Sequence, residues 1–261
     1  MIARRLALAL PALALSRPAA AFTLQGRPEQ GGLLRGEGAA GRAVTLDGRA
    51  VRVSPDGRFA LGFGRDHASR ATLRVGAETR VLEVAPRDWR IQHITGLPPA
   101  QVTPDAEALR RIGAERTRLA QARATDTPRT DFTGDLAWPA RGRISGVFGS
   151  QRVLNGQPRA PHYGLDIAGP VGTPIAATLP GRVTLAADFF FFGKLVVLDH
   201  GHGVHSLYAH LNDIHVAEGA EVNQGARIAD MGATGRVTGP HLHFSLGWYA
   251  TWLDPEPLLP G

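Results

Sequence analysis

Cysteine is absent from this sequence of 261 residues, and several kinds of chemistry are excluded with it. Without cysteine the chain cannot form a disulfide, use a thiol nucleophile, bind zinc through thiolates or carry a lipid on an N-terminal cysteine. Lysine is almost absent as well, because Lys194 is the only one. A lipoyl or biotinyl carrier needs a lysine at a hairpin tip, and Lys194 follows Phe-Phe-Gly instead. The sequence therefore argues against a carrier domain.

The sequence also lacks an apolar run long enough to cross a membrane. The apolar stretch at residues 6–15 contains a proline, whereas a spanning helix needs about 20 apolar residues. Two arginines precede this stretch, and three alanines follow it at 19–21, a pattern typical of a secretory signal peptide. We expect residues 1–21 to be a signal peptide cleaved near Ala21. The mature protein should then be periplasmic or secreted, with no stable membrane insertion.

Basic charge is spread thinly along the chain. Half of the formal net charge of +6 comes from Arg4, Arg5 and Arg17 in the expected signal peptide. No run of basic residues alternates with aromatic side chains, so we expect no nucleic-acid partner. Hydrophobic residues make up 43% of the chain and charged residues 20%, which excludes intrinsic disorder. The 32 glycines and 19 prolines favour many turns and short strands, and hence a mainly β protein.

The sequence divides into three parts after the signal peptide. Residues 22–86 contain short segments that alternate apolar and polar residues around turn signals such as Asp47-Gly48, which predicts a small immunoglobulin-like β-sandwich. Residues 87–137 read as a linker with one amphipathic helix, which begins near Pro104 and carries Leu109, Ile112 and Leu119 on one stripe. Residues 138–261 predict an antiparallel β-sheet domain related to barrel-sandwich folds.

Histidine is concentrated in the last part, where eight of the ten histidines lie between 162 and 243. His162 precedes Asp166 by four residues, and His241 and His243 are separated by one residue. On a strand, residues i and i+2 point to the same face, about 7 Å apart. We therefore expect one of the two to bind a metal and the other to reach the metal-bound water or the substrate.

Zinc suits these side chains. A catalytic zinc site uses three protein ligands and leaves its fourth position to water, and two histidines with one aspartate supply that number without cysteine. The ion lowers the pKa of its bound water to about 7. Neighbouring histidines can then carry protons. No His-Glu-x-x-His helix occurs in the sequence, so a glutamate base is not expected.

These histidines lie within a series of ordered motifs that covers about residues 140–258. The motifs are Phe148-Gly149, His162-Tyr163-Gly164-Leu165-Asp166-Ile167, Gly172-Thr173-Pro174-Ile175, Gly201-His202-Gly203, Tyr208-Ala209-His210-Leu211, 219–225 and Thr238-Gly239-Pro240-His241-Leu242-His243-Phe244. In this order and spacing the sequence resembles the lysostaphin-type (M23, LytM-like) zinc endopeptidases of the bacterial cell wall.

The resemblance implies a role for each residue of the site. One zinc ion per chain would be held by His162, Asp166 and His243, and His210 and His241 would act beside it on the water and the oxyanion. Ser245 stands where the family often has an acidic residue. The implied activity is that of an exported, monomeric zinc metalloendopeptidase that hydrolyses peptidoglycan cross-links or stem peptides. The alternative is a catalytically inactive LytM-like protein that binds cell wall or activates an amidase.

The substrate-binding residues are not defined by these motifs. Phe189 to Phe192 predict either the wall of a substrate groove or a fully buried strand, and Phe191, Phe192 and Tyr208 are the candidates for such a wall.

The remaining features are expected to be structural. His200, His202, His205 and His215 are interpreted as turn and surface residues. Strand alternation places His205 and His210 on opposite faces. The role of the N-terminal part stays open between an inhibitor of the groove, a wall-binding module and a spacer.

Overall fold

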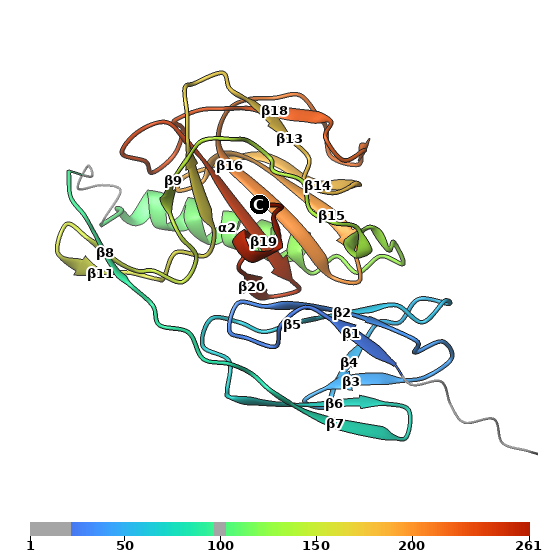
Figure 1. The fold of residues 1–261 in the computed structure, drawn as a ribbon. Helices are drawn as coiled ribbons and strands as arrows, with labels where there is room; N and C mark the ends of the chain where they lie inside the picture. Colours follow the sequence, from blue (N-terminus) through green and yellow to red (C-terminus); the bar gives the residue numbers. More distant parts are fainter. Residues whose placement is uncertain (1–21, 97–102) are drawn as a thin grey trace, which may run out of the picture.

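The structure, a computed structural model, describes residues 22–96 and 103–261 (Figure 1). The predicted signal peptide at 1–21 lies outside the described residues. Within them the chain is mainly β, with antiparallel sheets and the single α-helix α2, as the sequence predicts. No helix in the described part is long and apolar enough to cross a membrane.

The N-terminal part consists of a three-stranded sheet, β1-β2-β5, and a four-stranded sheet, β4-β3-β6-β7, which lie one above the other (Figure 1). Both are antiparallel. Asp47 and Gly48 form the tight turn between β3 and β4, both with positive φ, as a two-residue hairpin turn of this kind requires. The immunoglobulin-like relation of this part stays a prediction. Its strands are β1 (Thr23–Gln25), β2 (Leu33–Glu37), β3 (Val44–Leu46), β4 (Arg49–Val51), β5 (Phe59–Gly62), β6 (Arg70–Val75) and β7 (Glu78–Glu83).

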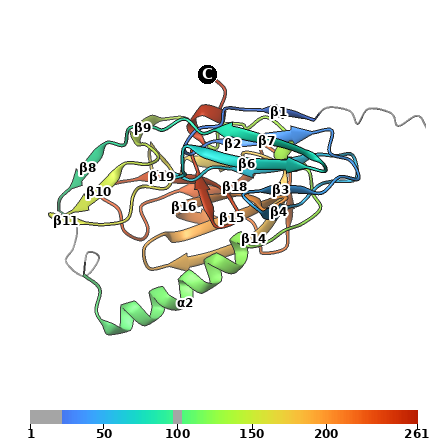
Figure 2. The same ribbon diagram turned by 90° about the horizontal axis from the view of Figure 1, so that it is seen from below.

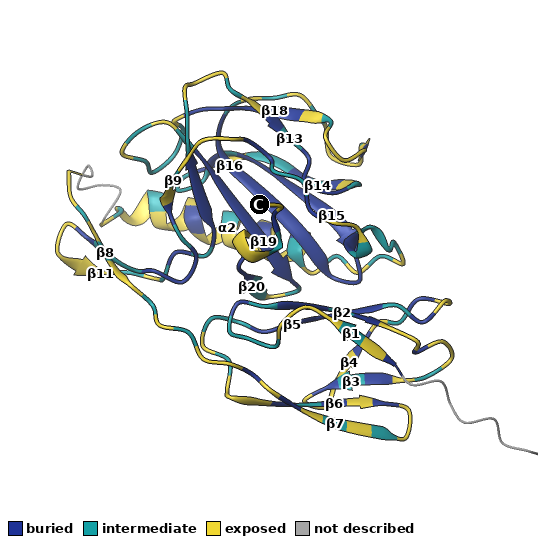
Figure 3. Cartoon of the chain, in the orientation of Figure 1, coloured by how far each residue is buried: buried dark blue, intermediate teal, exposed yellow. Residues whose placement is uncertain are grey.

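The C-terminal part is built on a ten-stranded antiparallel sheet in the order β17-β14-β15-β16-β19-β12-β9, in which β18 joins β13 to β16 and β20 pairs with β19. Figure 3 shows that its long central strands are buried along most of their length. The strands are β9 (Arg143–Gly146), β12 (Leu165–Ala168), β13 (Pro174–Ala176), β14 (Gly181–Phe189), β15 (Gly193–Gly201), β16 (Val204–Ile214), β17 (Glu221–Val222), β18 (Arg227–Met231), β19 (His241–Trp248) and β20 (Thr251–Leu253). Two 3-10 turns, η1 (Asp131–Thr133) and η2 (Glu256–Leu258), complete it.

The large sheet is covered on both faces. Tyr208 and Phe244, which pair across β16 and β19, point into the main apolar core. The opposite face carries Leu207 and Ala209, and helix α2 (Ala106–Arg123) packs against it (Figure 2). The helix begins at Asp105, whose carboxylate accepts the N–H of Ala108. This face of β16 is therefore covered by a helix that ends about 80 residues before the strand begins.

The helix buries only part of the predicted apolar stripe. Ile112, Leu119 and Ala122 are buried, but the side chain of Leu109 is 56% exposed. Leu109 lines the open groove that is described below, which accounts for its exposure.

The segment that leads to α2 is also held against the C-terminal part. Its strand β8 (Ile91–Ile94) pairs in parallel with β10 (Gln151–Leu154), which pairs in turn with β11 (Gln157–Pro158). Just before β8, the ring of Trp89 lies where a Cβ on Gly149 would be, only 2.0 Å away. Gly149 has φ +82, so the close approach and the backbone conformation both require glycine here.

The two parts share one continuous apolar core. Gly62 at the end of β5 lies so close to Trp248 that a Cβ there would be 2.8 Å from the Trp248 Cβ. An ion pair of 2.8 Å joins Arg87 to the buried carboxylate of Asp254 nearby. The sandwich therefore packs on the β19–β20 edge of the large sheet.

Candidate metal centre

Two neighbouring strands and the loop before them bring His162, Asp166 and His243 together. Strands β12 and β19 are antiparallel, and Asp166 stands directly opposite His243. The register is fixed by the neighbouring pair Leu165 and Phe244, which is fully buried on the other face of the sheet. A slip of one residue would turn these apolar side chains outward, so the core holds the polar pair in place.

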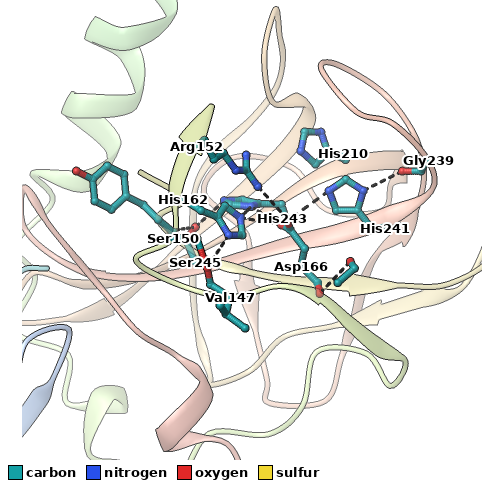
Figure 4. A network of polar contacts seen from close by, with 12 residues as sticks. Val147, Ser150, Arg152, His162, Asp166, His210, Gly239, His241, His243 and Ser245 are labelled. Atoms are coloured by element: carbon teal, nitrogen blue, oxygen red, sulfur yellow. Dashed lines mark hydrogen bonds and ion pairs between the residues drawn. The ribbon is translucent and has the colours of Figure 1, made fainter. Parts of the chain in front are cut away.

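The three side chains form a compact buried cluster, which we call the ligand cluster (Figure 4). Asp166 Oδ1 lies 2.9 Å from His162 Nε2 and 2.8 Å from His243 Nδ1, and the two nitrogens are 2.9 Å apart. The exposed fractions are 1% for His162 and 6% for each of the other two.

The outer nitrogen of each imidazole in the cluster has its own hydrogen-bond acceptor. His162 Nδ1 donates to the Val147 carbonyl at 3.0 Å. The Ser245 hydroxyl donates its proton to the Tyr163 carbonyl, so its oxygen accepts from His243 Nε2 at 2.9 Å. With these protons on the outer nitrogens, both inner nitrogens and the carboxylate offer only lone pairs to one another. Three converging acceptors without a shared proton fit a cation, and two nitrogens with one oxygen are ligands that zinc accepts.

The charge states agree with this interpretation. Burial lowers the pKa of His243 to about 4, which keeps the imidazole neutral at pH 7. Asp166 Oδ2 accepts a hydrogen bond of 3.0 Å from Arg152 Nη2, which fixes the orientation of the carboxylate.

His210 and His241 lie beside the ligand cluster, and each has one nitrogen held by the backbone. His241 Nδ1 donates to the Gly239 carbonyl at 2.8 Å, and its Nε2 lies 3.8 Å from Asp166 Oδ1. His210 Nδ1 donates to the Thr234 carbonyl at 2.9 Å. The two ring centres are 4.8 Å apart. Burial and the neighbouring histidines hold the pKa of His210 well below its usual range. Each Nε2 is therefore available to accept a proton.

His210 reaches this site because the strand does not stay regular. Its φ of 63° is in the left-handed region, and the pairing of β16 with β15 shifts register around it, between Tyr208 and Leu211. On a regular strand His210 would share the core-facing side of Tyr208. The irregularity turns its ring to the face of His243, with 6.0 Å between the ring centres. The prediction that His205 and His210 face opposite ways is therefore wrong, since His205 packs over Gly247 on the same face.

A groove with a volume of about 540 Å³ runs past the ligand cluster. His162, His210 and His243 line it, and Phe191 and Phe192 form part of its wall. Residues of α2, among them Leu109, Ile112 and Arg116, form the facing wall. No residue of the described segment 22–96 lines the groove.

The structure corrects the prediction for Tyr208. Its side chain is fully buried in the main core, against Phe244, and its hydroxyl accepts the Thr178 N–H at 2.9 Å. The residue lies two positions before the left-handed His210, where β16 is still regular, so the ring points away from the groove.

The other histidines of this part are structural, but most are not on the surface. His200, His202 and His205 are all buried, between 0% and 2% exposed, which corrects the expectation of surface positions. His202 lies in a turn with φ 52° and packs on Phe132. His215 is the more exposed one, and its Nε2 lies 3.0 Å from the Asp230 carboxylate.

Several residues that shape the site are missed by sequence analysis. Ser245 is noticed only as a departure from the family pattern, yet it orients His243. Gly164 lies inside the first histidine motif, and a Cβ there would come within 2.7 Å of His243 Cε1 and Ser245 Oγ. Arg152 and the groove wall from α2 carry no local signal, because only the folded chain brings them to the metal site.

Comparison with known proteins locates the site in a described family. Residues 160–255 match the model of peptidase family M23. Over 105 residues the chain is 43% identical to the peptidoglycan DD-endopeptidase ShyA of Vibrio cholerae, which covers 40% of this chain and 24% of that protein. It is 36% identical over 134 residues to the cell division protein DipM of Caulobacter vibrioides, covering 49% and 21%. The chain thus spans about a quarter or less of the length of these relatives.

One solved structure matches nearly the whole chain. A crystal structure of a proposed peptidase M23 from Pseudomonas aeruginosa aligns with a TM-score of 0.68 and 29% identity, covering 88% of this chain and 93% of that one. The arrangement of sandwich, helix and large sheet therefore has a close counterpart.

Proposed function

Residues 160–255 of this chain form a domain of peptidase family M23, as the sequence motifs predict, and from this premise we propose that the protein is an exported zinc metalloendopeptidase. It hydrolyses peptide bonds in peptidoglycan cross-links or stem peptides. The observation that carries the proposal is the ligand cluster, in which three converging acceptors share no proton. It borders the groove, and His210 and His241 lie beside it.

One zinc ion per chain is held by His162, Asp166 and His243. A bound divalent ion supplies Lewis acidity, which acidifies water and polarises a peptide carbonyl. The side chains that hold it are oriented by Val147, Ser245 and Arg152 through the contacts described above.

His210 and His241 move the protons. Each donates its Nδ1 proton to a backbone carbonyl, so Nε2 can take a proton from the attacking water and later give it to the leaving amine. Once protonated, either imidazole can donate a hydrogen bond to the oxyanion that develops on the scissile carbonyl. The backbone carbonyls of Thr234 and Gly239 keep both rings in the required tautomer.

Peptidoglycan is the proposed substrate because the relative ShyA is named as a peptidoglycan DD-endopeptidase. The groove, with a volume of about 540 Å³, runs past the ligand cluster and can receive a peptide segment there. Export follows from the expected signal peptide, and places the enzyme in the periplasm or outside the cell. We propose a monomer as the acting form.

The proposal is tested by metal analysis and digestion of purified sacculi on the same protein samples. The wild type is expected to hold one zinc per chain and to release soluble fragments. His243→Ala should lose both zinc and activity, whereas His210→Ala should keep zinc and lose activity. His215→Ala, a histidine outside the groove, is the matched control and should retain both.

Two outcomes would overturn the proposal. A wild type that is zinc-replete but leaves several types of sacculi intact would favour the alternative of an inactive wall-binding regulator. A wild type that digests sacculi equally well after complete removal of metal would contradict the metal mechanism.

A further inference from the structure

The groove beside the ligand cluster is lined by an excess of positive charge. Arg116, Arg152, Arg159 and Arg236 all line it, against the carboxylate of Glu115. Glu115 is already engaged, since it accepts hydrogen bonds from Arg111 and from the Phe190 N–H. The wall nearest to the metal site is therefore cationic, although the chain as a whole carries a modest charge.

Arg152 is the member closest to the chemistry. Its Nη2 contacts Asp166 Oδ2, but its Nε is buried and has no hydrogen-bond partner. A buried guanidinium N–H without an acceptor is costly, which indicates that an acceptor is missing from this wall. Arg152 lies on β10, which is paired on both edges, so the guanidinium is fixed rather than free to turn to solvent.

Arg236 reaches the same wall from the other side of the site. It lies two residues after Thr234, the residue that holds His210, and its guanidinium stacks 4.2 Å above the Phe191 ring. Its backbone N–H donates to the Phe191 carbonyl at 2.9 Å. The segment that positions a proton carrier thus also positions this arginine.

The three guanidiniums are close enough to repel one another. Burial, together with the charges of Arg152 and Arg159, lowers the pKa of Arg236 to about 10. Like charges gathered in a partly buried groove favour the binding of an anion among them. A planar carboxylate matches the guanidinium fork and can accept two parallel hydrogen bonds from one arginine.

We propose that Arg152, Arg159 and Arg236 form a subsite that binds a carboxylate of the peptide substrate next to the scissile bond. This inference rests on the proposed function, and it makes the enzyme selective for acidic peptides over neutral ones such as glycine bridges. The carboxylate has two sources in a cell-wall stem peptide, a side chain or the C-terminus. Arg152 links the subsite to Asp166, so a bound carboxylate sits beside the reacting bond.

The test measures binding separately from hydrolysis, by calorimetry on the full-length His210→Ala chain loaded with zinc. The ligands are a synthetic stem pentapeptide and versions in which each free carboxylate is amidated in turn. We expect amidation of one carboxylate to weaken binding about tenfold or more. The carboxylate whose amidation weakens binding is the one that the subsite recognises, either a side chain or the C-terminus of the peptide.

Arg236→Gln in the same background removes one guanidinium without touching the ligand cluster. It should bind the unmodified peptide about as weakly as the parent binds the critical amidated peptide, and it should show no further loss on amidation. Arg143→Gln, an exposed arginine of β9 outside the groove, is the matched control and should leave every affinity unchanged.

Equal affinities for all peptides, or no measurable binding of any of them, would overturn the subsite. The failure of the proposed function has a different signature. If the wild type never cleaves peptidoglycan but still binds the amidated peptide more weakly than the unmodified one, the subsite is supported and the proposed peptidase activity is contradicted.

Discussion

The N-terminal sandwich and the large C-terminal sheet are both antiparallel and rich in short strands, but they bury different chemistry. Among the described residues, Ser54 is the buried polar side chain of the sandwich, whereas the large sheet buries several histidines and aspartates. Apolar burial stabilises either part by about 25 cal/mol per Å². Burial of titratable groups is costly and is tolerated only with partners. The buried histidines and aspartates therefore lower the free energy of unfolding of the large sheet relative to an apolar core of the same size.

The two parts also differ in the regularity of their strands. In the sandwich the one residue in the described part with a positive φ that is not glycine is Asp47, at a tight turn. In the large sheet His210 is in the same region within a strand. A non-glycine residue held in this conformation inside a strand indicates that the surrounding fold enforces it. It does so at the residue that the proposed chemistry needs most.

The largest expected effect separates function from stability. His162→Ala should abolish metal binding and reduce sacculus digestion by more than about 1,000-fold, because the cluster loses one of three ligands. Zinc content and digestion rate are the measurements. Phe59→Ala in the sandwich is the counterpart: it should lower the free energy of unfolding by about 3–5 kcal/mol, while the folded protein keeps its zinc.

A folded Phe59→Ala protein that had lost both zinc and activity would contradict this prediction, because the packing of the sandwich would then control metal binding in the large sheet. Circular dichroism on the same samples shows the folded fraction.

The second effect is a dependence of stability on acid that originates in the large sheet. Burial lowers the pKa of His200 to about 4, so the folded state keeps this imidazole neutral. Below about pH 6.5 the unfolded state binds a proton that the folded state rejects, so stability falls as the pH falls toward 4. The contribution of His200 is about 3 kcal/mol. Denaturant unfolding at pH 7, 5.5 and 4.5 measures it.

His200→Gln should flatten this slope. Phe59→Leu in the sandwich should lower stability by a similar amount at every pH and leave the slope as it is. A slope that His200→Gln does not change would show that other groups govern the acid sensitivity.

The third effect concerns backbone space at the site. Gly164→Ala should reduce kcat/KM about 100-fold, since the new Cβ would lie 2.7 Å from His243 Cε1 and from the Phe244 carbonyl oxygen. Gly113→Ala makes the same change on the exposed side of α2, where no atom lies within 4 Å. There it should raise the free energy of unfolding by about 0.5–1 kcal/mol without loss of activity.

Steady-state rates on a soluble peptide substrate compare the two variants. If Gly164→Ala were as active as Gly113→Ala, the loop before β12 would have to relax around the added methyl group.

The smallest effect tests the orientation of a single ligand. Ser245→Ala removes the acceptor for His243 Nε2, so zinc affinity should fall about tenfold. Competition with a chelator measures the affinity, and the thermal stability should change little. An unchanged affinity would indicate that the Asp166 and His162 contacts alone orient the ring.

The sequence could predict what depends on local patterns. The turn at Asp47-Gly48 and the mainly β fold follow from residue type and spacing, and the grouping of His162, Asp166 and His243 is what the resemblance to the M23 motifs implies. Patterns failed where the folded chain departs from regular alternation or joins distant segments. The orientation of Tyr208 and the relative orientation of His205 and His210 differ from the prediction for one reason, the left-handed residue within β16. Leu109 differs because it lines the groove, whereas Leu119 packs against the sheet.

The residues that hold Arg152 lie outside the segment that matches the family. Strand β10 is the middle strand of a small sheet, with β8 from 60 positions earlier on one edge, and the facing wall of the groove comes from α2. The segment that matches the family therefore carries the ligand cluster, while the stretch before it shapes the groove beside that cluster. Under the proposed function, substitutions upstream of residue 138 would change peptide selectivity without altering a group that takes part in bond cleavage.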